Sequence, residues 1–430
     1  GDEEMEKKAF FQQLDERTDI RYTDSGLKIF RLKFPRAHLR LCNVKIDFGS
    51  RNVCIRAESG DTLLPYGTAH FLEHLLFWHN GRNLYSDFFA HGALLNAFTT
   101  YTDTNFMFTS LPDRLRQTIP ILLDALWNHS FDKKIVAQEK AVITSEIQTA
   151  HLNHQLSYHY QLISMLSPSS PAAVFPAGRI EDIEALDISD LQKAYKAAYQ
   201  APRMTLFLIG GSENTETLLP PHLQLEKRPD YHAERKIIPA CPPALSQKMV
   251  LGDEERMEDT WTGLQIGALP GQNDLLTIKL YWDIASRILF QLDSPFFQEI
   301  QQTYRLEIDR LSAETYIYED GGFLILHSQG THSSAYIDVA SYYVTQKKEQ
   351  VAAWLQYGKD SLTYAIIYDS DYVRKCFEWA AECDRCDCSF LDMYHIIQDM
   401  DAQVFLSLID AMASSNKAII HVSQKEAIRQ

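Results

Sequence analysis

Apolar and polar residues alternate in two short runs near the start of the chain, at 27–32 and 43–48. Because successive side chains of a strand point to opposite faces, this alternation predicts two β-strands of one sheet. Two further runs of this kind, at 93–100 and 104–111, are separated by a short turn at 101–103. Their spacing predicts a β-hairpin.

Apolar residues that recur every three or four positions predict helices between and after these strands. One helix covers the segment around 68–77, a second lies near 85–90, and a third spans 112–128. A long helix is predicted from 133 to about 165, and the proline-containing stretch 168–176 ends it. A helix at 190–199 and an apolar strand at 204–209 follow.

The second part of the chain repeats this order of elements at a coarse level. It contains a strand at 261–268, a helix at 275–292, a hairpin at 311–329, helices to 414 and a last strand at 418–422. We therefore expect an α+β fold of two related α/β-sandwich domains, each a mostly antiparallel sheet covered by helices. Residues 225–246 have several prolines and charges and few periodic apolar residues, which predicts a linker between domains 5–224 and 247–430.

The amino-acid composition agrees with two globular domains, and the net charge argues against one class of partner. A chain of 430 residues with 45% apolar residues can fill more than one core. The net charge of −16 argues against a nucleic-acid partner, which would need clustered lysines and arginines. A negative net charge is consistent with a protein that is simply soluble and equally with one that binds a basic peptide substrate.

The ends and cysteines of the chain predict its location. No apolar run is long enough for a transmembrane segment, and the first residues lack the apolar centre of a signal peptide, with Met5 as the natural start. Seven cysteines, an odd number, favour reduced thiols. We expect a cytoplasmic protein, and peripheral attachment to a membrane complex stays open.

The strongest chemical signal is the five-residue motif from His70 to His74, within the predicted helix at 68–77. Residues four apart share a helix face, so both imidazoles can bind one metal ion, and Glu73 beside them can act as a general base. In a chain with 15 histidines, chance would produce this pattern only about 0.03 times. A catalytic zinc site usually takes three protein ligands, so a further ligand must come from elsewhere in the chain.

Two glutamates on the predicted helix from 133 are seven residues apart, Glu139 and Glu146. This spacing is two helical turns, so both carboxylates face the same way. A glutamate on a long helix usually faces solvent. Glu146, however, lies among Val142, Ile143 and Ile147, which indicates that part of this surface is packed.

Together these residues resemble the inverted-motif zinc peptidases of the pitrilysin, insulinase and mitochondrial processing peptidase family. The resemblance covers nearly the whole chain, and the matching stretches are Phe48-Gly49-Ser50-Arg51, His70 to Phe77, Asn96-Ala97-Phe98-Thr99, and Glu139 with Glu146. It implies a pitrilysin-like fold of the LuxS/MPP-like type. It also implies a metalloendopeptidase with Zn²⁺ as cofactor, acting on a precursor peptide of the bacteriocin type, for example in leader removal.

The resemblance also implies roles for single residues. His70, His74 and Glu146 would bind zinc, Glu73 would be the general base, and Glu139 would support the site without binding the ion. Asn96, Ala97 and Phe98 would lie where the substrate peptide adds to an edge strand as an extra β-strand.

One stretch departs from the family pattern. Active members usually carry an arginine and a tyrosine in the second half that bind the substrate carbonyl, and here Gln301 and Ile308 take their places. Neither can supply a cationic or phenolic donor to an oxyanion. By analogy with two-subunit members, we expect a heterodimer in which a related partner chain supplies both groups.

Alternatives of other kinds stay open at this stage. The chain could be a non-catalytic subunit of a complex that matures the precursor peptide, acting in peptide binding or assembly, although such a subunit has no need of Glu73. Four cysteines, Cys376, Cys383, Cys386 and Cys388, could hold a second metal, but their spacing fits no standard ligand pattern and favours inert thiols.

Five other histidines are weaker candidates for metal binding. We expect solvent exposure rather than metal binding for His151, His154 and His159. We expect local hydrogen bonding or packing for His79 and His91.

Overall fold

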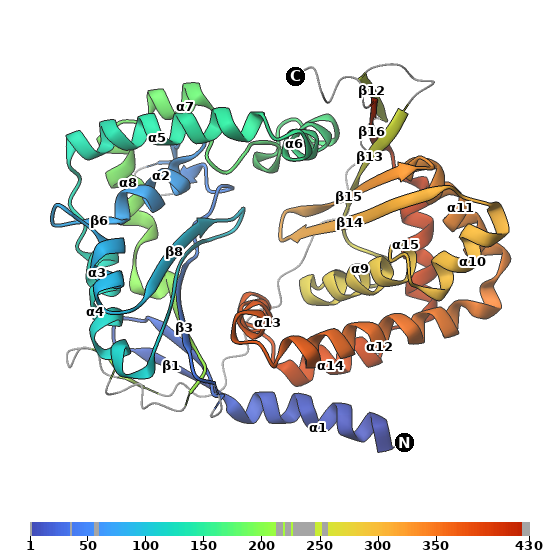
Figure 1. Ribbon diagram of the computed structural model, residues 1–430, viewed down its shortest axis with the longest axis horizontal. Coiled ribbons are helices and arrows are strands. Elements are labelled where there is room, and N and C mark those ends of the chain that lie inside the picture. Colours follow the sequence, from blue (N-terminus) through green and yellow to red (C-terminus); the bar gives the residue numbers. More distant parts are fainter. Residues whose placement is uncertain are drawn as a thin grey trace.

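A computed structural model describes residues 2–34, 37–55, 60–211, 218–219, 225–226, 246–251 and 257–423. The chain forms two halves, each built from a sheet and covering helices (Figure 1). The expected α+β fold of two related, mostly antiparallel α/β sandwiches is confirmed. Among the described residues, no helix combines the length and the apolar character that crossing a lipid bilayer requires.

The first half contains a seven-stranded sheet with the order β11-β1-β2-β10-β3-β9-β8. The pair β2–β10 is parallel, and the other neighbours are antiparallel. Its strands are β1 (Thr18–Thr23), β2 (Lys28–Leu32), β3 (Arg40–Ile46), β8 (Leu94–Thr99), β9 (Thr104–Ser110), β10 (Met204–Ile209) and β11 (Leu225–Glu226). Two small ladders join β4 (Cys54–Ile55) to β5 (Thr62–Leu63) and β6 (Trp78–His79) to β7 (Arg82–Asn83).

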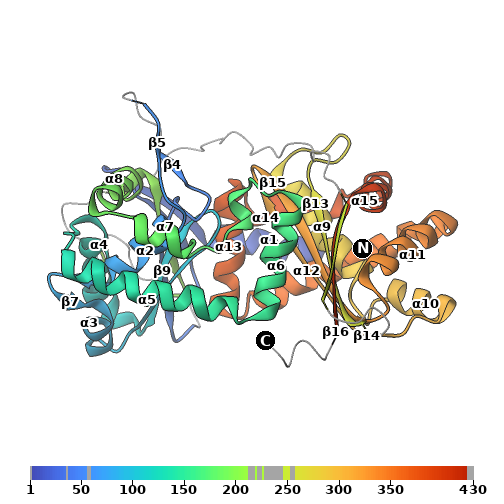
Figure 2. The ribbon, with the colours of Figure 1, turned by 90° about the horizontal axis from the view of Figure 1, so that it is seen from above.

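Except for one helix at 154–166, which lies against the sheet of the second half, the helices of the first half cover one face of this sheet (Figures 1 and 2). They are α2 (Thr68–Leu76), α3 (Leu84–Ala90), α4 (Leu115–Trp127), α5 (Lys133–His151), α6 (His154–Leu166), α7 (Ile180–Ala185) and α8 (Ile188–Ala198). The apolar side chains of α2, α4 and α8 share one core with those of β2, β3, β9 and β10.

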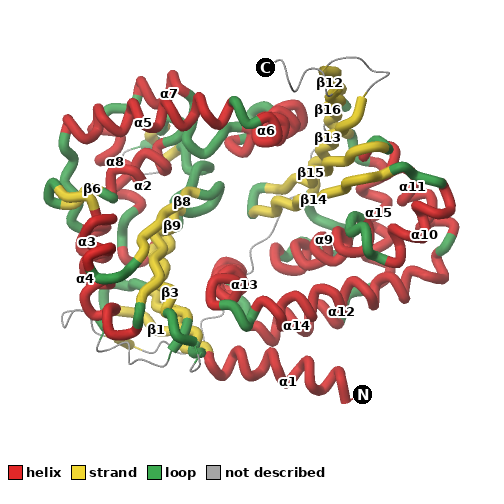
Figure 3. The backbone as a smooth tube through the Cα atoms, in the orientation of Figure 1, coloured by secondary structure: helices red, strands yellow, loops and turns green. Residues whose placement is uncertain are grey.

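The second half contains a five-stranded sheet with the order β12-β16-β13-β15-β14, in which the pair β12–β16 is parallel. Its strands are β12 (Gln247–Leu251), β13 (Met257–Ile266), β14 (Ile308–Tyr318), β15 (Gly321–Gly330) and β16 (Lys417–Ser423). Its helices are α9 (Leu275–Leu289), α10 (Pro295–Tyr304), α11 (Ser333–Gln346), α12 (Val351–Asp369), α13 (Val373–Cys386), α14 (Phe390–Gln398) and α15 (Ala402–Ser414). Figure 3 shows α9 against this sheet with α12 and α14 on its far side, whereas α13 lies against β3 and β10 of the first half.

One helix of each half packs against the sheet of the other half. Phe207 of β10 packs its ring against Phe377 of α13, with ring centroids 5.3 Å apart. On the opposite side, Leu162 and Leu166 of α6 share a core cluster with Ile325 and Ile420 of the second sheet. The halves are therefore joined by apolar packing at two places.

Two features of the first 170 residues differ from the sequence-based expectation. The predicted single helix from 133 to about 165 is wrong, because the chain turns between α5 and α6, where the side chain of Asn153 accepts a hydrogen bond from the backbone N–H of Leu156. The turn lets α6 reach the second sheet. The helix α1 (Asp2–Arg17) was not predicted, and it buries Phe11 and Leu14 against the second half.

The predicted domain limits 5–224 and 247–430 stay a prediction. The helix α1 lies against the second half, since the backbone N–H groups of Phe390 and Leu391 donate to the Asp15 carboxylate. Of the predicted linker 225–246, only 225–226 and 246 belong to the described residues.

A buried ion cluster also joins the halves and predicts an acid-sensitive fold. Asp384 of α13 pairs with Lys45 of β3 and, at 2.7 Å, with Lys28 of β2. Burial by itself raises the pKa of Asp384, but the attraction of the two lysines outweighs burial and lowers the pKa to about 2. A carboxylate whose pKa is depressed by folding stabilises the protein above its unfolded pKa of 3.8, and this stability is lost as the pH falls toward 2.

We therefore expect the urea midpoint of the wild type to fall between pH 5 and pH 3. An Asp384→Asn variant should start from a lower midpoint, because two buried lysines lose their partner, and should lose less over the same pH interval. Equal losses in both proteins would show that Asp384 does not control acid stability.

Candidate functional site

The helix α2 is fixed at its start by Gly67, which has φ of +83°. A Cβ at this position would lie 2.3 Å from the carbonyl oxygen of Ala177, so only glycine fits. Phe71, Leu72, Leu75 and Leu76 are buried in the core of the first half. The opposite face therefore presents the imidazoles of His70 and His74.

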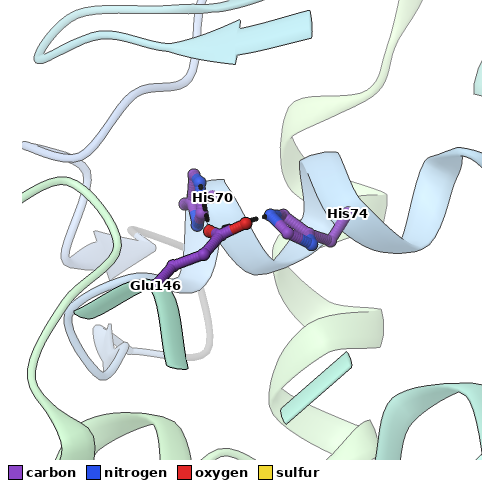
Figure 4. Close-up of side chains that lie close together, drawn as sticks. All are labelled: His70, His74 and Glu146. Carbon is purple, nitrogen blue, oxygen red and sulfur yellow. Dashed lines mark ion pairs between the residues drawn. The ribbon is translucent and has the colours of Figure 1, made fainter. Parts of the chain in front are cut away.

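The helix α5 brings a third side chain to these imidazoles (Figure 4). Oε2 of Glu146 lies 3.8 Å from Nε2 of His70 and 3.4 Å from Nε2 of His74. The three side chains can place one ligand atom each within 4.8 Å of one another. Among the described residues, this is the only group of three or more histidines, cysteines or acids so placed.

Glu139 lies two turns before Glu146 and holds His74 in place. Its carboxylate contacts Nδ1 of His74 at 3.0 Å and accepts a hydrogen bond from Nε1 of Trp78, also at 3.0 Å. Burial lowers the pKa of His74, but the contacts with Glu139 and Glu146 raise it to about 9. Burial and the neighbouring His74 lower the pKa of His70 to about 4.

Glu73 is buried beside this group, with 6% of its surface exposed. Its Oε2 accepts a hydrogen bond of 2.6 Å from Oγ1 of Thr99, at the end of β8. Burial raises the pKa of Glu73 to about 6, and the contact with Thr99 opposes this rise. A carboxyl group with a pKa near neutrality is suited to take up and return a proton.

The strand β8 lies at the edge of the first sheet and pairs only with β9 among the described strands. Asn96 and Phe98 are opposite Met107 and Asn105 of β9. Asn96 is exposed, and Ala97 and Phe98 are partly buried. The other edge of β8 is therefore placed where an extended peptide could pair with it.

The chemistry and spacing of the three ligand atoms fit a zinc ion. Zinc takes histidine nitrogens and carboxylate oxygens at about 2.1 Å, so two tetrahedral ligand atoms are about 3.4 Å apart. The Glu146 oxygen lies close to that separation from both Nε2 atoms. Three protein ligands leave one position for water or substrate, as in catalytic zinc sites.

The other candidate residues do not join a site of this kind. The cysteine cluster and His151, His154 and His159 contribute to no group of three metal ligands in the described part of the chain. Burial raises the pKa of Cys376 to about 12, which makes this thiol inert. His79 pairs with Asp124 and His91 contacts the carbonyl of Asp87, so local hydrogen bonding is confirmed for both.

The structure places Gln301 on α10 and Ile308 at the start of β14. Ile308 is 6% exposed and belongs to the core of the second half, and Gln301 is a partly buried residue of α10. Thr99 and Trp78 were not predicted as parts of the site. Thr99 is the last residue of the matching stretch Asn96-Ala97-Phe98-Thr99 but was given no role, and no sequence signal points to Trp78.

Comparison with known proteins finds relatives of this chain. The profile of the family described as "Insulinase (Peptidase family M16)" matches residues 35–169, which include all three ligand candidates. The chain is 98% identical over 426 residues to "Putative zinc protease AlbF" of Bacillus subtilis (strain 168), covering 99% of this chain and 100% of that protein.

Solved structures share the fold at low sequence identity. A protease from Helicobacter pylori matches with a TM-score of 0.72 and 14% identity, over 94% of this chain and 99% of that one. A peptidase M16 inactive domain from Pseudomonas fluorescens matches with a TM-score of 0.71 and 14% identity, over 94% and 97%. The same architecture is thus found both in a protease and in a domain described as inactive.

Proposed function

This chain belongs to the insulinase family (peptidase family M16), and on that premise we propose that it is the zinc-binding subunit of a metalloendopeptidase. The observation that carries the proposal is the convergence of His70, His74 and Glu146 beside the buried carboxylate of Glu73. The substrate we propose is a precursor peptide of the bacteriocin type, from which a leader is removed in the cytoplasm.

In this proposal the metal ligands, the edge of β8 and Glu73 have separate roles in catalysis. His70, His74 and Glu146 would hold Zn²⁺, and the ion would supply a Lewis acid that lowers the pKa of water to about 7 and polarises the scissile carbonyl. The edge of β8 orients the peptide through backbone hydrogen bonds. Glu73 takes the proton of the attacking water and delivers it to the leaving amine, while Thr99 fixes the position of its carboxylate.

Glu139 is proposed to act by orienting His74. Replacing it with glutamine weakens the contact that fixes the His74 ring, so we expect zinc affinity to fall by about 10- to 100-fold. The measurement is zinc titration against a competing chelator. As a control, Glu184→Gln changes an exposed glutamate of α7 and should leave zinc affinity unchanged. Unchanged affinity in Glu139→Gln would contradict the orienting role.

The missing arginine and tyrosine lead to a second prediction. We propose that a related partner subunit supplies them, because Gln301 and Ile308 offer no such donors. The purified chain alone should then bind zinc but cleave the precursor far more slowly than the mixture of both subunits. Full cleavage by the chain alone would overturn the need for a partner.

A non-catalytic subunit is the second candidate, and the match to an inactive M16 domain favours keeping it. Such a subunit would bind the precursor with the same affinity whether or not zinc is present, and no cleavage would follow even with the partner. The burial of the Glu73 carboxylate beside His70 and His74, where it contacts Thr99, argues for catalysis.

A further inference from the structure

A cavity lies between the end of α5, α6 and the segment that leads into α7. Its volume is about 400 Å³, which falls within the range of about 300–1,000 Å³ typical of pockets for small ligands. Leu156, Val174, Phe175 and Ile180 give it apolar walls. Apolar groups of a ligand would therefore be favoured inside.

One wall of this cavity is continuous with a proposed zinc ligand. Ala150 lines the cavity, and it lies four residues after Glu146 on α5. Residues four apart are neighbours on the same helix face. A ligand that contacts Ala150 would therefore press on the helical turn that positions Glu146.

The opposite wall is joined to the helix of the two histidines. Gly178 lines the cavity with φ of +86°, and a Cβ there would lie 2.6 Å from the carbonyl oxygen of Tyr66. A Cβ at Gly67, where the helix that bears His70 begins, would in turn lie 2.3 Å from the carbonyl oxygen of Ala177, the neighbour of Gly178. This backbone-to-backbone packing leaves no room for the wall to move without moving the start of α2.

The third wall is α6, through Tyr160 and Gln161. The other side of this helix packs on the sheet of the second half. Figures 1 and 2 both show α6 between α5 and the strands β13 and β16. The cavity thus touches the supports of two proposed zinc ligands and the junction of the halves.

The rim of the cavity carries opposite charges that suit the end of a peptide. Arg179 is exposed, with its guanidinium carbon 5.0 Å from the centre of the Tyr66 ring, and Glu181 lies near it. No ion pair joins Arg179 to Glu181 in the described structure, and Arg179 also acts electrostatically on the neighbouring carboxylate of Asp182. A terminal carboxylate can face Arg179 while a backbone N–H of the same peptide donates to Glu181.

We propose that this cavity binds the carboxyl-terminal end of an apolar peptide, and that its occupancy tightens zinc binding at His70, His74 and Glu146. The second part rests on the proposed function. Peptide-bond hydrolysis creates a new carboxyl terminus, so a cleavage product belongs to the class of ligand that fits.

The test uses the full chain and the dipeptide N-acetyl-Leu-Phe, with its carboxy-terminal amide as the uncharged counterpart. Calorimetry on chelator-treated protein should show one saturable site, with the free acid bound about threefold more tightly than the amide. Arg179→Gln should remove this preference. The control Arg116→Gln, at an exposed position of α4, should retain it.

A second variant tests whether the dipeptide occupies the cavity, independently of the charge of Arg179. Ser164→Phe places a ring at the exposed edge of the cavity and should abolish binding without lowering the melting temperature. Binding that survives in Ser164→Phe, or no saturable binding to the wild type, would overturn the assignment of the cavity.

The coupling between peptide binding in the cavity and zinc binding is measured by zinc titration with and without saturating dipeptide. We expect the peptide to tighten zinc binding about fivefold, and zinc to tighten peptide binding by the same factor, because linkage is reciprocal. Peptide binding with no change in zinc affinity would overturn the coupling alone. Peptide binding to a chain that holds no zinc at all would leave the cavity assigned and overturn the proposed function instead.

Discussion

Replacing Glu73 with glutamine is expected to lower precursor cleavage by about 10²- to 10⁴-fold, the usual contribution of a positioned acid–base group. Glutamine keeps the size of the side chain and can still contact Thr99, but it cannot take a proton from water. Zinc content should stay at one ion per chain, because Glu73 is not among the three converging ligands.

The measurement is the initial rate of cleavage by the zinc-loaded chain with its partner subunit. Glu184→Gln, on the exposed side of α7, is the matched control and should cleave at the wild-type rate. A Glu73→Gln protein that binds zinc and cleaves at the wild-type rate would remove the general-base role.

Replacing His74 with alanine is the second change with a large expected effect. His74 is the proposed ligand with the most contacts, since both Glu139 and Glu146 lie within hydrogen-bonding distance of its ring. Its loss should reduce zinc affinity by more than the 10- to 100-fold expected for loss of a supporting partner, and cleavage should stop.

Zinc content after dialysis, measured by elemental analysis, tests this expectation. His395→Ala changes an exposed histidine of α14 and should retain the metal. If His74→Ala keeps one zinc ion at wild-type affinity, the ion is bound elsewhere in the chain.

The local parts of the site could be predicted from the sequence because they depend on short-range geometry. The pairing of His70 with His74 follows from the helical repeat, and the hairpin of β8 and β9 follows from alternation on either side of a tight turn. Glu139 and Glu146 were expected to share a face, and both do point toward the same end of α2.

The contacts between distant segments could not be predicted in this way. Trp78 meets Glu139 across 61 residues of sequence, and Thr99 meets Glu73 across 26, so each depends on how the helices pack. The break before α6 was missed because the apolar periodicity continues through it. Its cause is the sheet of the second half, which α6 covers.

The helix α1 was missed for a related reason. Charged and polar side chains dominate its sequence, and Phe11 and Leu14 are the residues that it buries. Its stability comes from docking on α14 and from the Lys7–Asp360 ion pair at 2.9 Å, and both partners lie more than 350 residues away.

The central claim is that this chain holds zinc through His70, His74 and Glu146 and hydrolyses a peptide bond with Glu73. The most direct test is mass spectrometry of the precursor peptide after incubation with the zinc-loaded chain and its partner subunit. We expect two products whose masses sum to the precursor plus one water, and an intact precursor with the zinc-loaded Glu73→Gln variant. An intact precursor with the wild-type pair, or the same two products with Glu73→Gln at the same rate, would contradict it.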